Sequence, residues 1–297
     1  MVLRGIMQEF LQYVFSGVTN GSVYAIIALG FSMLFGMTGL INFAQGEFVM
    51  LGALGMISLW KGAGLPLPAA IVLSTIGVSA VGLLLERAAI RNVRKPHPIV
   101  LVIVTIGASI FLRGAGMIGW GKESYSSPAF SRQGAFEVAG ATLLPQSLFI
   151  LGAVLLIVFG LQFFYRRTLT GKAMLACAIS KRAAWLQGIP SERLVLLAFA
   201  LSAGMGAIGG ILIAPISMSS YDMGMTLGLK GFCAAMLGGL GSSLGAVLGG
   251  LLLGLLEAFG VGFFSSSLKD AIAFVLLLGI LYVRPGGILG AKVVKRF

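Results

Sequence analysis

The sequence predicts an all-α membrane protein: a polytopic bundle of eight or nine spanning helices, some of them broken or re-entrant. Of the 297 residues, 58% are hydrophobic and 10% are charged, and the mean hydropathy is +1.02. A soluble domain does not need that much apolar surface, whereas a bundle of helices of about 20 residues each does. Glycine occurs 44 times, which suits membrane helices because small residues let their backbones pack closely. We therefore expect one transmembrane domain over residues 1–297.

Apolar segments follow one another along the chain and predict the spans in order. Long segments lie at 14–35, 40–59, 67–85, 99–118, 148–164, 194–213 and 268–283. Two shorter ones, at 226–240 and 244–256, are hardly long enough to cross a membrane alone, so we expect a broken or re-entrant arrangement there. Residues 119–145 carry charges of both signs and many serine, glycine and proline residues, which predicts an external loop.

Basic residues gather at 87–95, 166–193 and 284–296, which together hold two thirds of the lysines and arginines. Because such residues flank membrane spans on the cytoplasmic side, all three sites and the C-terminus are predicted to be cytoplasmic. Counting back from that terminus gives nine crossings, or eight if the two short segments merge. Residues 168–193 show apolar positions at helical spacing, so we expect one or two short helices at the membrane surface.

Three polar side chains, Asn42, Gln45 and Glu47, interrupt an apolar stretch at 36–54 that also contains four glycines. An ionisable group within a membrane is costly and usually faces a bundle interior or a water-filled cavity. One interpretation is that these residues border and gate a translocation pathway. The other is structural: they satisfy backbone groups at a helix start, or Glu47 simply lies at a helix end near the lipid headgroups.

A weak internal similarity indicates a duplication. Residues 39–53 resemble residues 228–242, and each is followed by a span that ends in Leu-Leu-Glu, at 84–86 and 255–257. An odd number of spans between the two copies would give them opposite orientations. Inverted repeats of this kind are common in transporters, whose pathways lie at the repeat interface.

The sequence offers no pattern typical of catalysis or of metal binding. No phosphate-binding GxxxxGK[ST] motif occurs, and Cys177, Cys233 and His97 stand alone. We therefore expect neither catalytic residues nor a metal site. An ion-coupled secondary transporter would use Glu47, and a channel would need rings of polar residues in an oligomer. A permease driven by a separate ATPase would need a cytoplasmic docking element, for which 168–193 is suited.

Three long motifs together resemble the permeases of branched-chain amino acid ABC importers of the LivH type, a family that includes urea and amide importers. They are GLINFAQGEFVMLGA (39–53), TGKAMLACAISKRAAWLQGI (170–189) and GLGSSLGAVLGGLLLGLLE (239–257). The resemblance implies inward transport of branched-chain amino acids or a related small polar solute across the cell inner membrane. It also implies a second permease of the LivM type, an external substrate-binding protein, and two cytoplasmic ATPases that bind ATP and Mg. No cofactor is expected in this chain.

The same resemblance assigns an ATPase-coupling segment. Its residues match Gly171, Ala173, Ala176, Ala184, Leu186, Gly188 and Ile189. Small side chains there would allow close docking, and Gly188 can end a helix. An ion-coupled secondary transporter remains the alternative function.

Overall fold

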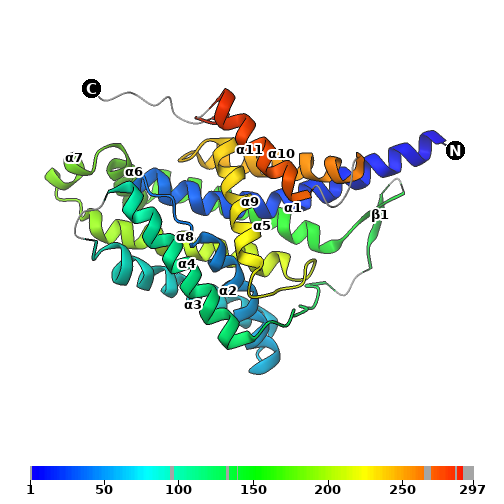
Figure 1. Ribbon diagram of the computed structural model, residues 1–297, viewed down its shortest axis with the longest axis horizontal. Coiled ribbons are helices and arrows are strands. Elements are labelled where there is room, and N and C mark those ends of the chain that lie inside the picture. Colours follow the sequence, from blue (N-terminus) through cyan, green and yellow to red (C-terminus); the bar gives the residue numbers. More distant parts are fainter. Residues whose placement is uncertain are drawn as a thin grey trace.

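The computed structural model describes residues 2–93, 97–131, 134–138, 140–263, 269–284 and 286–289, without the side chains of 2–6 and 269. The basic residues at 94, 95, 292, 295 and 296 therefore lie outside the described residues, as does the side chain at position 4. The chain is a bundle of α-helices with one small β-hairpin (Figure 1).

The helices follow the predicted spans, with differences at the breaks. The helices are α1 Val2–Thr38, α2 Gln45–Ile57, α3 Leu67–Leu85, α4 Pro98–Trp120, α5 Pro145–Arg167, α6 Leu169–Ile179, α7 Lys181–Leu186, α8 Ser191–Ile213, α9 Met223–Gly238, α10 Ser243–Phe263 and α11 Lys269–Val283. Short π-helical turns, η1 Ser58–Gly62 and η2 Glu86–Ile90, extend α2 and α3, and strands β1 Phe136–Val138 and β2 Ala141–Leu143 form an antiparallel hairpin.

Six of the described helices are long and apolar enough to span a membrane: α1, α3, α4, α5, α8 and α10. The prediction that 244–256 is too short was wrong, because α10 runs for 21 residues. The prediction that 226–240 is a short segment was right, since α9 has 16 residues. The expected span at 40–59 was wrong at its start: the chain is not helical at 40–44, and α2 begins only at Gln45. Gly39, with φ of 70°, follows the end of α1 and turns the chain there.

The two ends of the bundle differ in character. At one end, here called the hairpin end, the side chain of Gln12 in α1 accepts a hydrogen bond from Thr142 N at 2.8 Å, which fixes the β-hairpin to the first helix. Figure 1 shows the hairpin beside the N-terminal part of α1, with α6 and α7 at the far end of the molecule. At that far end, here called the basic end, Arg91 beyond η2 pairs with Glu192 at the start of α8.

The C-terminal segment also lies at the basic end, against the last turn of α9. Ile288 N and Leu289 N donate hydrogen bonds of 2.9 Å to the carbonyls of Leu237 and Gly238. These carbonyls belong to the last turn of a helix, where no intrahelical partner is available. The described basic residues of all three clusters therefore belong to one end of the molecule, as the sequence predicted.

An inverted repeat is visible in the order and packing of the helices, with α1 to α4 matched by α8 to α11. Each half has a long helix, a non-helical segment, a short helix and two further helices. The pairing is reciprocal. Helix α1 packs antiparallel on α10, where a Cβ at Gly250 would stand 2.5 Å from Ala25 Cα, and α8 packs on α3, where a Cβ at Gly82 would stand 2.8 Å from Phe199 O. Such approaches require glycine because backbone lies against backbone.

The register proposed from the sequence, 39–53 on 228–242, was wrong. It sets the first residues of α2 against the middle of α9, whereas the structure matches the start of α2 at Gln45 with the start of α9 at Met223. Glycine-rich apolar segments resemble one another at several offsets, so sequence similarity alone does not fix the register. The starts of the two short helices, which correspond in the repeat, also touch each other in the structure. This contact forms the site described next.

Candidate functional site: a pocket where two short helices begin

The first turns of α2 and α9 touch through glycines. A Cβ on Gly46 would lie 2.1 Å from the carbonyl oxygen of Gly224 and 3.0 Å from Gly228 Cα. Each helix begins after a break, so its first turn carries the partial positive charge of the helix dipole, although Gln45 N, Glu47 N and Met225 N donate to carbonyls of the preceding turn. The two breaks therefore place two positive helix ends side by side within the bundle.

Of the three polar residues singled out in the sequence, Asn42 and Gln45 hold the break together. Asn42 accepts a hydrogen bond from Ala44 N at 3.1 Å and turns the chain into α2. Gln45 Nε2 donates to the carbonyl of Ser202 in α8 at 2.9 Å, and Ser202 Oγ lies 2.8 Å from Gln45 Oε1 and 2.8 Å from Gly30 O in α1. These buried contacts fasten the start of α2 to the two central helices.

Glu47 has different surroundings, because it lines a pocket. Its side chain is 1% exposed, and Oε1 accepts a hydrogen bond from Ser109 Oγ in α4 at 2.9 Å. Arg113 Nε, one turn further along α4, lies 3.3 Å from the same oxygen. Within the described part of the chain, the other oxygen, Oε2, has no hydrogen-bond partner. Of the three residues predicted as translocation or gating candidates, the structure places only Glu47 at the pocket.

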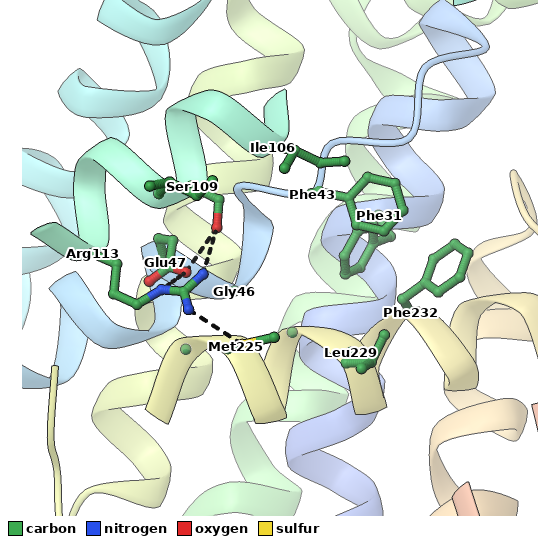
Figure 2. A pocket seen from close by; sticks show the side chains of 13 residues that line it. Phe31, Phe43, Gly46, Glu47, Ile106, Ser109, Arg113, Met225, Leu229 and Phe232 are labelled. Atoms are coloured by element: carbon green, nitrogen blue, oxygen red, sulfur yellow. Dashed lines mark hydrogen bonds and ion pairs between the residues drawn. The ribbon is translucent and has the colours of Figure 1, made fainter. Parts of the chain in front are cut away.

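The remainder of the pocket wall is apolar. Three aromatic rings gather at one side: Phe232 of α9 has its centroid 5.8 Å from that of Phe31 and 5.6 Å from that of Phe43. Figure 2 shows these rings apart from the charged pair, with Ile106 and Leu229 also on the wall. The cavity volume is about 190 Å³, below the roughly 300–1,000 Å³ of sites for drug-sized ligands. It suits a small solute that has both an apolar and a charged part.

Sequence analysis did not single out Arg113, although a signal was present. It lies within the segment predicted to span at 99–118, where a charged residue is rare and usually functional. Ser109 precedes it by one helical turn and therefore lies on the same face of α4. Glu47 was recognised because it is a carboxylate in an apolar segment, close to Asn42 and Gln45, whereas its partner Arg113 is 66 positions away.

A second charged cluster, which the sequence analysis also did not single out, links the helices of the second half of the repeat. Lys230 of α9 lies 3.0 Å from Glu257 Oε1 of α10 and 2.8 Å from Asp270 Oδ1 of α11. The Tyr24 hydroxyl donates to Glu257 Oε1 at 3.2 Å, which adds α1. Lys230 and Glu257 are buried, and neither lines the pocket that contains Glu47. This cluster has the geometry of a brace between helices.

The predicted ATPase-coupling residues lie on α6, on α7 and in the turn after α7. Gly171 and Ala184 are buried within the chain itself, and Ala173, Ala176 and Ile189 are partly buried. Leu186 and Gly188 are exposed. Gly188, with φ of 76°, ends α7 as predicted, because its N–H bonds to Trp185 O and that of the following residue to Ala184 O.

A helix bundle with apolar spans, helix breaks that meet within it and a small amphipathic pocket at those breaks defines a membrane permease. The family model described as branched-chain amino acid transport system / permease component matches residues 13–281, and the chain belongs to this family. It is the membrane-spanning permease subunit of an ABC importer; subunits of this kind transport and are not themselves enzymes.

Relatives cover almost the whole chain. It is 36% identical to the high-affinity branched-chain amino acid transport system permease protein BraD of Pseudomonas aeruginosa, over 97% of this chain and 98% of that protein. It is 37% identical to the corresponding permease LivH of Escherichia coli K12, over 97% of each chain. The chain also superposes on PsaBC from Streptococcus pneumoniae with a TM-score of 0.47, at 16% identity over 93% of this chain and 92% of that chain.

Proposed function

We propose that this subunit imports branched-chain amino acids, or a related small polar solute, together with a second permease of the LivM type. Two ATPases that bind ATP and Mg would drive the cycle from the cytoplasm, and a binding protein would deliver the solute from outside. The observation that carries the substrate proposal is the pocket, because a charged pair faces it from one side and aromatic rings from the other. A small solute with a polar head and an apolar side chain matches both sides.

The pocket also supports the second permease. The Arg113 side chain is 27% exposed and lies about 10 Å, two helical turns, before the end of α4. Around it, Ile110 and Met225 are 62% and 57% exposed. A guanidinium that faced lipid at this depth would be costly, so the open side needs a protein cover. We assign this face of α4 and α9 to the LivM-type partner.

Helices α6 and α7 support the ATPase proposal. Each is capped by a side chain, with Gly171 N donating to Thr168 Oγ1 at 3.0 Å and Ala183 N to Ser180 Oγ at 3.3 Å, so both helices are well defined. Trp185 and Leu186 of α7 are each 70% exposed at the basic end. An exposed apolar surface on a structured appendage is typical of a docking site. Gly171 instead lets α6 fold closely on α5, since its Cβ would meet Phe164 O at 2.1 Å.

The distribution of basic residues supports the orientation that we propose. Arg91, Arg166, Lys181 and Arg284 belong to the basic end, and basic residues beside membrane spans remain in the cytoplasm. We therefore propose that the chain spans the cell inner membrane with α6, α7 and the C-terminus in the cytoplasm. The β-hairpin then lies on the external side. The docking helices then face the compartment that contains ATP.

Reconstitution tests the proposal. The chain, purified with its partner permease and the two ATPases and placed in liposomes, should accumulate leucine only when ATP and a loaded binding protein are supplied. Capture of the ATPases should fail when Trp185 is replaced by glutamate. Uptake by the chain alone, driven by a proton or sodium gradient without ATP, would contradict the proposal and favour an ion-coupled secondary transporter.

A further inference from the structure

We propose that the Glu47–Arg113 pair binds the zwitterionic head of the transported amino acid, with the ammonium group on Glu47 and the carboxylate on Arg113. The apolar side chain of the solute then lies among Phe31, Phe43 and Phe232. This inference rests on the proposed function, because it assigns the residues that contact an amino acid during its passage. It also makes the pocket a specific site within the permease, additional to any selection by the binding protein.

The guanidinium of Arg113 has donors that lack good acceptors. Arginine carries five N–H donors in a planar fork. In the described structure its nitrogens meet one carboxylate oxygen at a long 3.3 Å, the Ser109 hydroxyl at 3.5 Å and the Met225 thioether at 3.2 Å. A thioether is a weak acceptor, and 3.5 Å is at the limit for a hydrogen bond. A carboxylate could bind both terminal nitrogens in the bidentate geometry that arginine favours.

Glu47 offers the complementary group. Its Oε2 is buried and has no partner among the described residues, and an unpaired buried carboxylate oxygen is costly. This oxygen lies against Gly224, where a Cβ would stand only 2.9 Å away. Because glycine has no side chain, the carboxylate lies directly against the first turn of α9 at the pocket wall. An ammonium group supplies three donors and a positive charge, and it would satisfy this oxygen.

The start of α9 favours the same polarity for the solute. Met225 of its first turn lines the pocket on the side of Arg113, as Figure 2 shows, whereas Gly224 lies against Glu47 Oε2. Positive helix ends favour anions, so the carboxylate of the solute belongs between Arg113 and this turn. The aromatic rings lie away from the charged pair, which sets the side chain of the solute toward Phe232. The cavity volume of about 190 Å³ then restricts the solute to one with a small side chain.

The test measures leucine imported per ATP hydrolysed in the reconstituted importer, with the loaded binding protein at saturation. Arg113→Gln should lower this ratio about tenfold or more, because a hydrogen-bonded charge contact is lost, while stimulation of ATP hydrolysis by the binding protein stays within about twofold. Arg113→Lys should give an intermediate ratio, since it keeps the charge but not the fork. Lys122→Gln, at an exposed cation of the external loop, is the matched control and should leave the ratio unchanged.

Each outcome decides a different point. Absence of ATP-dependent leucine uptake in the wild-type importer would contradict the proposed function. If the wild-type importer takes up leucine normally but Arg113→Gln leaves the ratio of leucine to ATP unchanged, only the present inference is overturned. An equal loss of uptake and of ATP hydrolysis also leaves this ratio unchanged and has the same meaning.

Thermal unfolding of the wild-type complex without binding protein gives a second measurement if Arg113→Gln does not assemble. Leucine should raise the unfolding midpoint, because a ligand that binds the folded state stabilises it. Isoamylamine, which lacks the carboxylate, and 4-methylpentanoate, which lacks the ammonium group, should raise it much less at equal concentration. An equal rise with either analogue would show that the zwitterionic head is not recognised.

Discussion

The contact between the two short helices predicts that Gly46→Ala is harmful although alanine is a better helix former. The new Cβ would stand 2.1 Å from Gly224 O and 3.0 Å from Gly228 Cα. Both neighbours belong to backbone, so no side chain can rotate away. The starts of α2 and α9 must separate by about 1 Å to restore van der Waals contact. Overpacking of this kind costs about 1–3 kcal/mol, against a gain of at most about 1 kcal/mol in helix propensity.

Thermal or denaturant unfolding of the purified chain in detergent measures this effect. We expect Gly46→Ala to lower the free energy of unfolding by about 1–2 kcal/mol and to reduce leucine uptake, because the pocket wall moves. Gly152→Ala in α5 is the matched control, since nothing lies within 4 Å of a Cβ at that position; it should be neutral or slightly stabilising. Equal stability and uptake in both variants would refute the close contact of α2 with α9.

Three further predictions concern residues outside the pocket. Gln45→Ala should lower the free energy of unfolding by about 1–3 kcal/mol, because two buried hydrogen bonds between Gln45 and Ser202 are lost. Leucine uptake per assembled importer should stay near wild type, and a selective loss of uptake would show a pathway role. Lys230→Met should cost about 3–5 kcal/mol in unfolding measurements, and the double variant with Glu257→Met should recover part of it; no recovery would contradict the brace. Leu186→Asp should abolish co-purification of the ATPases without changing the circular dichroism of the chain, and intact capture would exclude α7 as their docking site.

The sequence predicted the outer helices well and the breaks poorly. The third span was predicted at 67–85, and α3 has these bounds, because a proline turn precedes it and charged residues follow it. The segment at 40–44 was predicted as helix because it is apolar except for Asn42. Its departure from the helix depends on a turn at Gly39 and on the contacts of Asn42 and Gln45 with distant helices. Hydrophobic periodicity contains no information on either.

The candidate site was predictable only in part, because some of its residues stand out locally in the sequence whereas their contacts join distant segments. Glu47 stands out because a carboxylate within an apolar segment is rare, and Arg113 could have been found by the same criterion. That the two meet depends on the packing of α4 on the first turn of α2, across 66 positions. The aromatic side of the pocket draws Phe31, Phe43 and Phe232 from three separate segments, and no local pattern brings them together. The two short helices α6 and α7, in contrast, follow from apolar positions at helical spacing, and one or two such helices were expected in 168–193.

The inverted repeat gives a reason why only one of the two charged clusters is a candidate for the solute. In each half, an ion pair joins the short helix to the fourth helix: Glu47 with Arg113 between α2 and α4, and Lys230 with Asp270 between α9 and α11. The second pair is completed by Glu257, and its lysine is 5% exposed. The first pair has poor acceptors for its arginine and opens on a pocket. Two related positions have thus diverged, one into a closed brace and the other into a pair that an amino acid can complete.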